Sequence, residues 1–333
     1  LLLDFWPLNR IETETGLSTF RDPALRKRAI SLVVEKLPLF AIAVIFSFVA
    51  YLAQQAGGAV GSFVSYPFWV RIANALVSYI VYIGKMFWPA GLAVYYPYNL
   101  NISIWQTTTS ALLLLVVSFA AIRLSRQLRY LPVCWFWFLG TLVPVIGLFQ
   151  LGSHAMADRY TYISMIGLFI IIAWGLEYLS GKFTKGRVIC STAIMIALIL
   201  LTARTIDQLG HWQSSTTLFN HALAVTENNL KAHNNLGTEL LRQQKYLQAA
   251  ENFEKGLRIN PNNALINYNY GLAMMHLEEW STAIKFFEKA LELNPGISPA
   301  HRDLANIFSK AGRTEQVIIH LEAAVAANPK NFE

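Results

Sequence analysis

Three consecutive stretches of 34 residues decide the fold of the C-terminal third: LKAHNNLGTELLRQQKYLQAAENFEKGLRINPNN (230–263), ALINYNYGLAMMHLEEWSTAIKFFEKALELNPGI (264–297) and SPAHRDLANIFSKAGRTEQVIIHLEAAVAANPKN (298–331). Prolines, small residues and large apolar residues each recur with this step. The members are Pro261, Pro295 and Pro329; Gly237, Gly271 and Ala305; Ala222, Gly256, Ala290 and Ala324; and Phe219, Phe253, Phe287 and Leu321. A fixed period of this length predicts a solenoid of stacked helical units.

The pattern within each unit resembles the tetratricopeptide (TPR) repeat. In that family small residues permit close helix crossing, the aromatic residue fills the groove, and proline ends the second helix. The resemblance covers 230–263, 264–297 and 298–331, preceded by a lone second helix at about 209–225. We therefore expect a TPR α-solenoid over 204–333.

One position on the first helix of each unit is a candidate for peptide binding. The residue two before the small Gly or Ala is Asn235, Asn269 or Asp303, and in a TPR superhelix it points into the concave face. An asparagine row can donate to a peptide C=O and accept from a peptide N–H. The row resembles the asparagine ladder in O-GlcNAc transferase, although asparagine is also simply a common TPR residue there. Asp303 interrupts the ladder.

The preceding part of the chain has the composition of a membrane domain. The protein is 54% hydrophobic and 14% charged, and nearly all its long apolar runs lie before Arg204. Soluble domains have roughly 45–50% apolar and about 25% charged residues. We expect an all-α protein, with a polytopic membrane domain over 1–203. Because the sequence begins with three leucines and ends just after Pro329, we expect it to be a fragment.

Five apolar runs are predicted to span the membrane: 37–56, 107–124, 131–151, 160–180 and the short 188–203. Twelve basic residues then fall on one side and three on the other. The first set is Arg10, Arg21, Arg26, Lys27, Arg28, Lys36, Arg123, Arg126, Arg129, Lys182, Lys185 and Arg187; the second is Arg71, Lys85 and Arg159. The positive-inside rule places the larger set in the cytoplasm and the TPRs in the periplasm or a lumen. The same rule accounts for the net charge of +7 without nucleic acid.

A sixth apolar stretch, 68–89, must not cross if this orientation holds. Its polar residues form one helical stripe, made of Arg71, Asn74, Ser78, Tyr82 and Lys85. Such a helix can lie in the outer interface, with the stripe toward water or lipid headgroups. The alternative is that 68–89 spans the membrane, which would invert every later loop.

The membrane part carries its own family resemblance. The runs are LLLDFWPLNR (1–10), EKLPLFAIAV (35–44), YLAQQAGGAV (51–60), ANALVSYIVYIGKMFWPAGLAVYYP (73–97) and FLGTLVPVIGLFQLGSHAMADRYTYISMIGLF (138–169). They resemble bacterial relatives of the TMTC proteins, which are similar to the GT-C class of glycosyltransferases. The resemblance implies transfer of a sugar from a polyprenyl-phosphate donor to a protein recruited by the TPRs. It also implies a catalytic acid upstream of Leu1, so no catalytic residue is assigned.

Three cations are candidates for binding the donor phosphate: Arg159, Arg71 and Lys85. Arginine binds phosphate in a bidentate geometry, whereas in a structural role Arg159 would be a solvated loop charge and the other two would extend toward the headgroups. His154 and Asp158 form a possible polar site beside Arg159. No cofactor motif is evident, and Cys134 and Cys190 offer no metal site. The alternative function is a non-catalytic, membrane-anchored TPR scaffold, and the bacterial inner membrane is the expected location.

Overall fold

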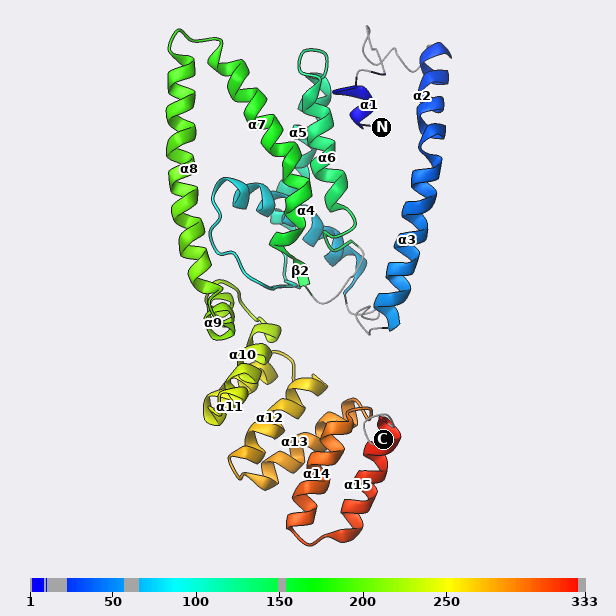
Figure 1. Ribbon diagram of the computed structural model, residues 1–333, viewed down its shortest axis with the longest axis vertical. Coiled ribbons are helices and arrows are strands. Elements are labelled where there is room, and N and C mark those ends of the chain that lie inside the picture. Colours follow the sequence, from blue (N-terminus) through cyan, green and yellow to red (C-terminus); the bar gives the residue numbers. More distant parts are fainter. Residues whose placement is uncertain (1, 9, 11–22, 57–65, 149–153, 329–333) are drawn as a thin grey trace. The chain divides into compact units, whose positions relative to one another are not determined.

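The computed structural model describes residues 2–8, 10, 23–56, 66–148 and 154–328 (Figure 1). The chain divides into two units. The first comprises Leu1–Ala90 and Tyr98–Thr205, and the second comprises Gly91–Pro97 and Ile206–Glu333. The sequence predicted a division at 203/204; the second unit also includes seven residues from the predicted membrane domain. Arg21, residues 149–151 of a predicted span and Pro329 lie outside the described residues.

Nearly all regular structure in the first unit is helical, which confirms the predicted all-α fold. Its elements are α1 (Leu2–Phe5), α2 (Pro23–Glu35), α3 (Leu37–Ala56), α4 (Phe68–Phe87), α5 (Ile104–Arg123), α6 (Tyr130–Leu142), strand β2 (His154–Met156), α7 (Thr161–Ser180) and most of α8 (Gly186–His211). A single 3₁₀ turn, Asp158–Tyr160, precedes α7. Within the described residues, four helical segments are long and apolar enough to cross a membrane, namely Phe68–Phe87, Ile104–Arg123, Asp158–Ser180 and Gly186–His211. They indicate a membrane-spanning region.

The predicted span over 131–151 is shorter in the structure. Helix α6 ends at Leu142, and a turn follows in which the backbone N–H groups of Val145 and Ile146 both donate to the Leu142 carbonyl. Pro144 has no N–H and cannot extend the helical ladder. Gly147 then adopts a φ of 93°, which is unfavourable for residues with a side chain.

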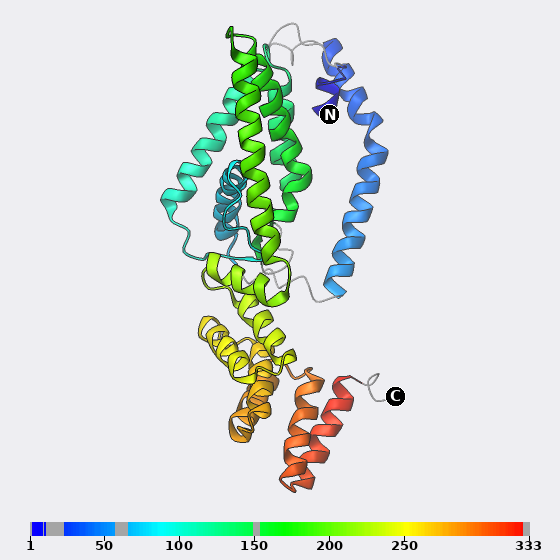
Figure 2. The same cartoon turned by 60° about the vertical axis from the view of Figure 1, so that its left-hand side comes forward.

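Helix α4 takes a different direction from its neighbours. Figure 1 shows it lying across the direction followed by α6 and α7, and Figure 2 shows the same unit from another side. It packs against α5. Its large apolar side chains Phe68, Trp69 and Phe87 are 60–64% exposed, so this helix presents an apolar surface to its surroundings.

The second unit contains strand β1 (Tyr96–Pro97) and helices α9 (Ser215–Val225), α10 (Leu230–Arg242), α11 (Tyr246–Ile259), α12 (Ala264–His276), α13 (Trp280–Leu293), α14 (Ser298–Lys310) and α15 (Thr314–Ala327). The lone second helix, predicted from about 209, begins at Ser215. The reason is local: Ser214 and Thr217 form a capping box that fixes the helix start. Asn229 and Asn263, which are 34 residues apart, cap α10 and α12 in the same way through their side chains.

The repeated glycine and phenylalanine meet in the core of the first two helix pairs. Phe253 and Phe287 are fully buried. A Cβ atom added at Gly237 would lie 2.5 Å from the Phe253 ring, and one added at Gly271 would lie 2.8 Å from Phe287. Glycine is therefore required because the ring occupies the space that any side chain would need.

Candidate functional site

The polar stripe of α4 is buried against the protein, which corrects the expected orientation toward water or headgroups. Asn74, Ser78 and Tyr82 are 6%, 3% and 0% exposed. Asn74 Nδ2 donates to the Ala155 carbonyl at 2.9 Å. The Tyr82 hydroxyl donates to the Ala157 carbonyl and accepts from the Ala157 N–H, both at 3.0 Å.

These contacts have a physical reason in the backbone that follows α6. Strand β2 (His154–Met156) is followed by Ala157 and the 3₁₀ turn, and Ala155, Met156 and Ala157 are all buried. Buried backbone N–H and C=O groups need partners, and a three-residue strand followed by a turn cannot supply them from its own residues. The amide and hydroxyl groups of α4 supply some of them, and they thereby fix the start of the 154–160 segment.

This fixed segment presents three of the predicted site residues. Asp158 and Arg159 lie in the 3₁₀ turn immediately before α7, and Arg159 is exposed, with its guanidinium 5.1 Å from the centre of the Tyr160 ring. His154 Nε2 lies 2.7 Å from the Tyr160 hydroxyl. The segment thus places a cation, a carboxylate and an imidazole–phenol pair within seven residues.

The structure separates the three predicted phosphate-binding cations into two groups. Lys85 is half-buried, donates to the Ala90 carbonyl at 3.2 Å, and interacts electrostatically with Asp158, next to Arg159. Arg71 lies near the other end of α4 and donates to the Leu148 carbonyl at 3.1 Å. Fourteen residues of α-helix separate Arg71 from Lys85, or about 21 Å. One phosphate cannot bind both, and Lys85 is the member that lies near the Asp158–Arg159 pair.

We expect Tyr82→Phe to loosen the 154–160 segment without unfolding the unit. The substitution leaves the N–H and C=O of Ala157 without this partner, and each buried unsatisfied group costs about 1–3 kcal/mol. Hydrogen exchange at 157–160 should accelerate in the purified full-length protein. Tyr79→Phe is the matched control, because Tyr79 lies on the same helix but donates to the Leu139 carbonyl. Equal acceleration in both variants would contradict the specific role of Tyr82.

In the second unit, the three predicted peptide-binding residues do not share one environment. Asn235 is half-buried, whereas Asn269 and Asp303 are 8% and 7% exposed. Asn269 Nδ2 donates to Asn234 Oδ1 at 2.8 Å, and Asp303 Oδ2 accepts from the Tyr268 hydroxyl at 2.9 Å. Both bonds join residues 35 positions apart, so they link neighbouring TPR repeats within the second unit.

Burial also changes the pKa of Asp303 in this row. It raises the pKa of the Asp303 carboxyl above its ordinary value, although the Tyr268 hydroxyl and the Arg302 guanidinium act in the opposite direction. The carboxylate that a peptide would meet is therefore largely enclosed and already bonded. Asn234 and Tyr268, which sequence reasoning did not single out, each stand one residue before a predicted position, at Asn235 and Asn269.

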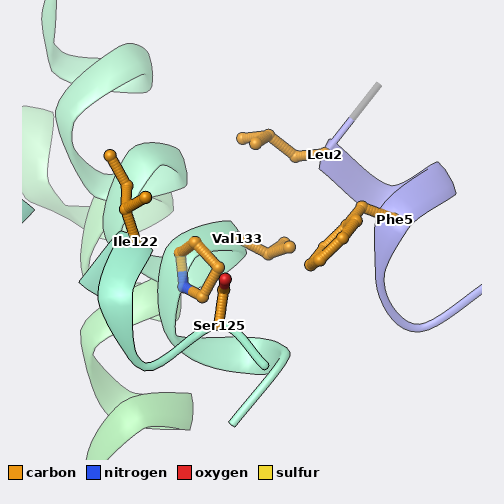
Figure 3. A pocket seen from close by; sticks show the side chains of 6 residues that line it. Leu2, Phe5, Ile122, Ser125 and Val133 are labelled. Atoms are coloured by element: carbon orange, nitrogen blue, oxygen red, sulfur yellow. The ribbon is translucent and has the colours of Figure 1, made fainter. Parts of the chain in front are cut away.

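A cavity of about 310 Å³ lies in the first unit, away from the candidate residues. Figure 3 shows α1 facing the α5–α6 turn across it, with Leu2 and Phe5 on one side and Ile122 and Val133 on the other. Its lining is almost entirely apolar, with Ser125 as a polar exception. The Arg129 guanidinium lies 5.2 Å from the Phe5 ring centre. None of the cavity's lining residues belongs to the predicted sites.

Comparison with known proteins identifies the repeats. A family model described as tetratricopeptide repeat matches residues 234–296. The chain carries tetratricopeptide repeats. Over this region it is similar to protein O-mannosyl-transferase TMTC3 of mouse (28% identity over 113 residues) and TMTC4 of human (32% over 106 residues). These alignments cover 33% and 31% of this chain, and 12% and 14% of the relatives.

The repeat region is thus similar to part of the TMTC proteins, and the chain spans only a small part of the curated relatives it matches. Among solved structures it is similar to MamA, with 23% identity, coverage of 38% of this chain and 71% of the other, and a TM-score of 0.34. It is also similar to YrrB, described as a TPR protein with an unusual peptide-binding site, with 16% identity, coverage of 50% and 84%, and a TM-score of 0.33. Among the described residues, no group of three or more His, Cys, Asp or Glu side chains could hold a metal ion.

Proposed function

We propose that this chain is part of a membrane-bound glycosyltransferase-like protein. It would help transfer a sugar from a polyprenyl-phosphate donor to a protein acceptor held by the TPRs. The observation that carries the proposal is the 154–160 segment, held by the polar face of α4, which presents Arg159 at the start of an apolar helix. The similarity of the repeat region to TMTC proteins named protein O-mannosyl-transferases supports the reaction class.

Arg159 is the residue of choice for the donor phosphate. A polyprenyl-phosphate sugar keeps its phosphate at headgroup depth, and a residue at the end of a membrane helix lies at that depth. A guanidinium there can form two charge-assisted hydrogen bonds to phosphate oxygens. Lys85 would add a second positive charge, partly offset by Asp158. Arg71 would hold the turn after α6 through the Leu148 carbonyl and not contact the donor.

The TPR groove would hold the acceptor or another protein partner. Asn235 is the most accessible of the predicted peptide-binding residues, whereas the side chains of Asn269 and Asp303 already bond to neighbouring units. A peptide would therefore bind to Asn235 and to those lone pairs on the side-chain oxygens of Asn269 and Asp303 that these bonds leave unused. Membrane lipid would surround the first unit, and the charge distribution requires no nucleic-acid partner.

The proposed orientation puts the twelve-residue basic set in the cytoplasm and the TPRs in the periplasm or a lumen. The burial of the α4 stripe is compatible with a helix at the outer interface, because Asn74 and Tyr82 bond to the backbone of Ala155 and Ala157 within the protein. Its exposed Phe68, Trp69 and Phe87 would face lipid.

The test is sugar transfer by the full-length protein in sealed vesicles of known orientation. Vesicles supplied with a polyprenyl-phosphate sugar should glycosylate a membrane-impermeant acceptor only when the acceptor is on the side opposite the basic loops. A scaffold without catalytic activity would bind partners and transfer no sugar in either orientation. Transfer on the side of the basic loops would refute the proposed topology.

A further inference from the structure

The segment Gly91–Pro97 belongs to the second unit, although it lies in the sequence between two helices of the first. The chain consequently passes between the units at 90/91, 97/98 and 205/206. A connecting loop of the first unit would not need to fold with the TPRs. We infer that this segment, termed the strap (91–97), is an intramolecular ligand that caps the first TPR helices.

The strap has a compact conformation of its own. The Tyr96 hydroxyl accepts from the Ala93 N–H at 2.7 Å and donates to the Gly91 carbonyl at 3.2 Å. Gly91 has a φ of 59°, a value that favours glycine. These two bonds close the strap on itself and leave the carbonyls of Leu92 and Tyr95 to outside donors.

Helices α9 and α10 provide those donors. His221 Nε2 donates to the Leu92 carbonyl at 3.1 Å, and Asn229 Nδ2 donates to the Tyr95 carbonyl at 3.0 Å. Asn229 is 2% exposed while it also caps α10, so its contact with the strap is a buried one. The Lys231 ammonium lies 4.9 Å from the Tyr95 ring centre, within the range of a cation–π contact.

An apolar contact completes the interface. Ala93 is 7% exposed and clusters with Ala222 and Ala232, both fully buried, while Val94 and Tyr96 pack around them. Alanine on both helices allows the strap backbone to approach closely. Each repeat of a solenoid buries its apolar face against the next repeat. The outer face of an end repeat has no such neighbour, so it needs a covering element. The strap supplies this cover at the N-terminal end.

Two of the residues that contact the strap differ from their equivalents in the later repeats. His221 occupies the position of Lys255 and Lys289, and Lys231 occupies that of Leu265 and Pro299. Asn229, in contrast, recurs as Asn263, which caps α12 in the same way.

A disulfide tests the contact in the full-length protein. A Cβ at Gly91 would lie 3.9 Å from Val225 Cβ, and the Cβ atoms of disulfides are about 3.5–4.5 Å apart. The variant Gly91→Cys/Val225→Cys is made with Cys134 and Cys190 replaced by serine and with a protease site placed in 182–185. After oxidation and cleavage, its two fragments should stay joined by the disulfide, and they should separate on reduction. Gly91→Cys/Leu321→Cys, which uses the last repeat, is the control. The inference would be overturned if the fraction of disulfide-linked fragments were no greater than in the control, or if the disulfide linked two different chains.

A second variant avoids the strained φ of Gly91. Ala93→Glu places a charge in the alanine cluster, so hydrogen exchange in α9 and α10 should accelerate roughly tenfold or more, while α14 and α15 stay unchanged. Leu100→Glu, at a 55% exposed position in the same loop, should leave exchange at its original rate. Unchanged exchange in the Ala93→Glu protein would also overturn the inference. Neither experiment measures sugar transfer, so its outcome is independent of the proposed enzyme activity.

Discussion

Replacing Phe253 with alanine is expected to lower the free energy of unfolding of the TPR domain by about 3–5 kcal/mol, the usual cost of removing a buried phenyl ring. The ring is fully buried and contacts the core formed by Leu236, Ala250 and Ile266. Domains are stabilised by only about 5–15 kcal/mol, so the loss is a large share of the total. Hydrogen exchange of α10–α12 in the full-length protein should report it. Leu247→Ala, on the same helix but 64% exposed, is the control.

The same core predicts a compensating pair. Gly237→Ala places a methyl group against the Phe253 ring and should cost about 1–3 kcal/mol through overpacking. Adding Phe253→Leu should restore part of that loss, because the third unit uses Ala305 and Leu321 at these positions. Strictly additive losses in the double variant would show that the two side chains do not share this space.

Replacing Arg159 with alanine is expected to raise the donor KM about 10- to 100-fold, since a charge-assisted hydrogen bond contributes roughly 1.5–3 kcal/mol. Arg159→Lys keeps the charge and loses the bidentate geometry, so its effect should be intermediate. The measurement is the rate of transfer with saturating acceptor and varied polyprenyl-phosphate sugar.

Two comparisons separate phosphate binding from a general charge effect. Arg126→Ala removes another exposed arginine, in the turn between α5 and α6, and should leave the donor KM unchanged. Binding of a protein partner to the TPRs should be unaffected in all three variants. A normal donor KM in the Arg159→Ala protein would remove this residue from the site.

Patterns within single segments were sufficient to predict much of the fold. The 34-residue period predicted the helix pairs, and the resemblance to TPRs implied the close packing of glycine and phenylalanine seen at Gly237–Phe253 and Gly271–Phe287. Apolar length predicted helices at 37–56, 107–124 and 160–180, close to the observed bounds. The prediction of a helix over 131–151 was wrong after Leu142, where α6 ends. Pro144 was the available sequence signal for this helix end.

The candidate site was only partly predictable. Sequence spacing put Arg71, Asn74, Ser78, Tyr82 and Lys85 on one face of a helix, which the structure bears out. It could not show that this face binds the backbone of Ala155 and Ala157, because those partners lie 75 to 81 residues away and their carbonyls have no sequence signature.

The sequence by itself therefore determined the helical repeats, the apolar helices and the polar face of α4, because each depends on the chemistry of residues close together in the chain. Only the tertiary structure decided where that polar face points, which ladder residues are already bonded, and that Gly91–Pro97 folds with the TPRs. The ladder bonds join side chains 35 residues apart, and the other two depend on backbone carbonyls met by distant side chains, such as that of Tyr95 by Asn229. Every residue has a carbonyl, so only the path of the chain determines which of them a side chain meets.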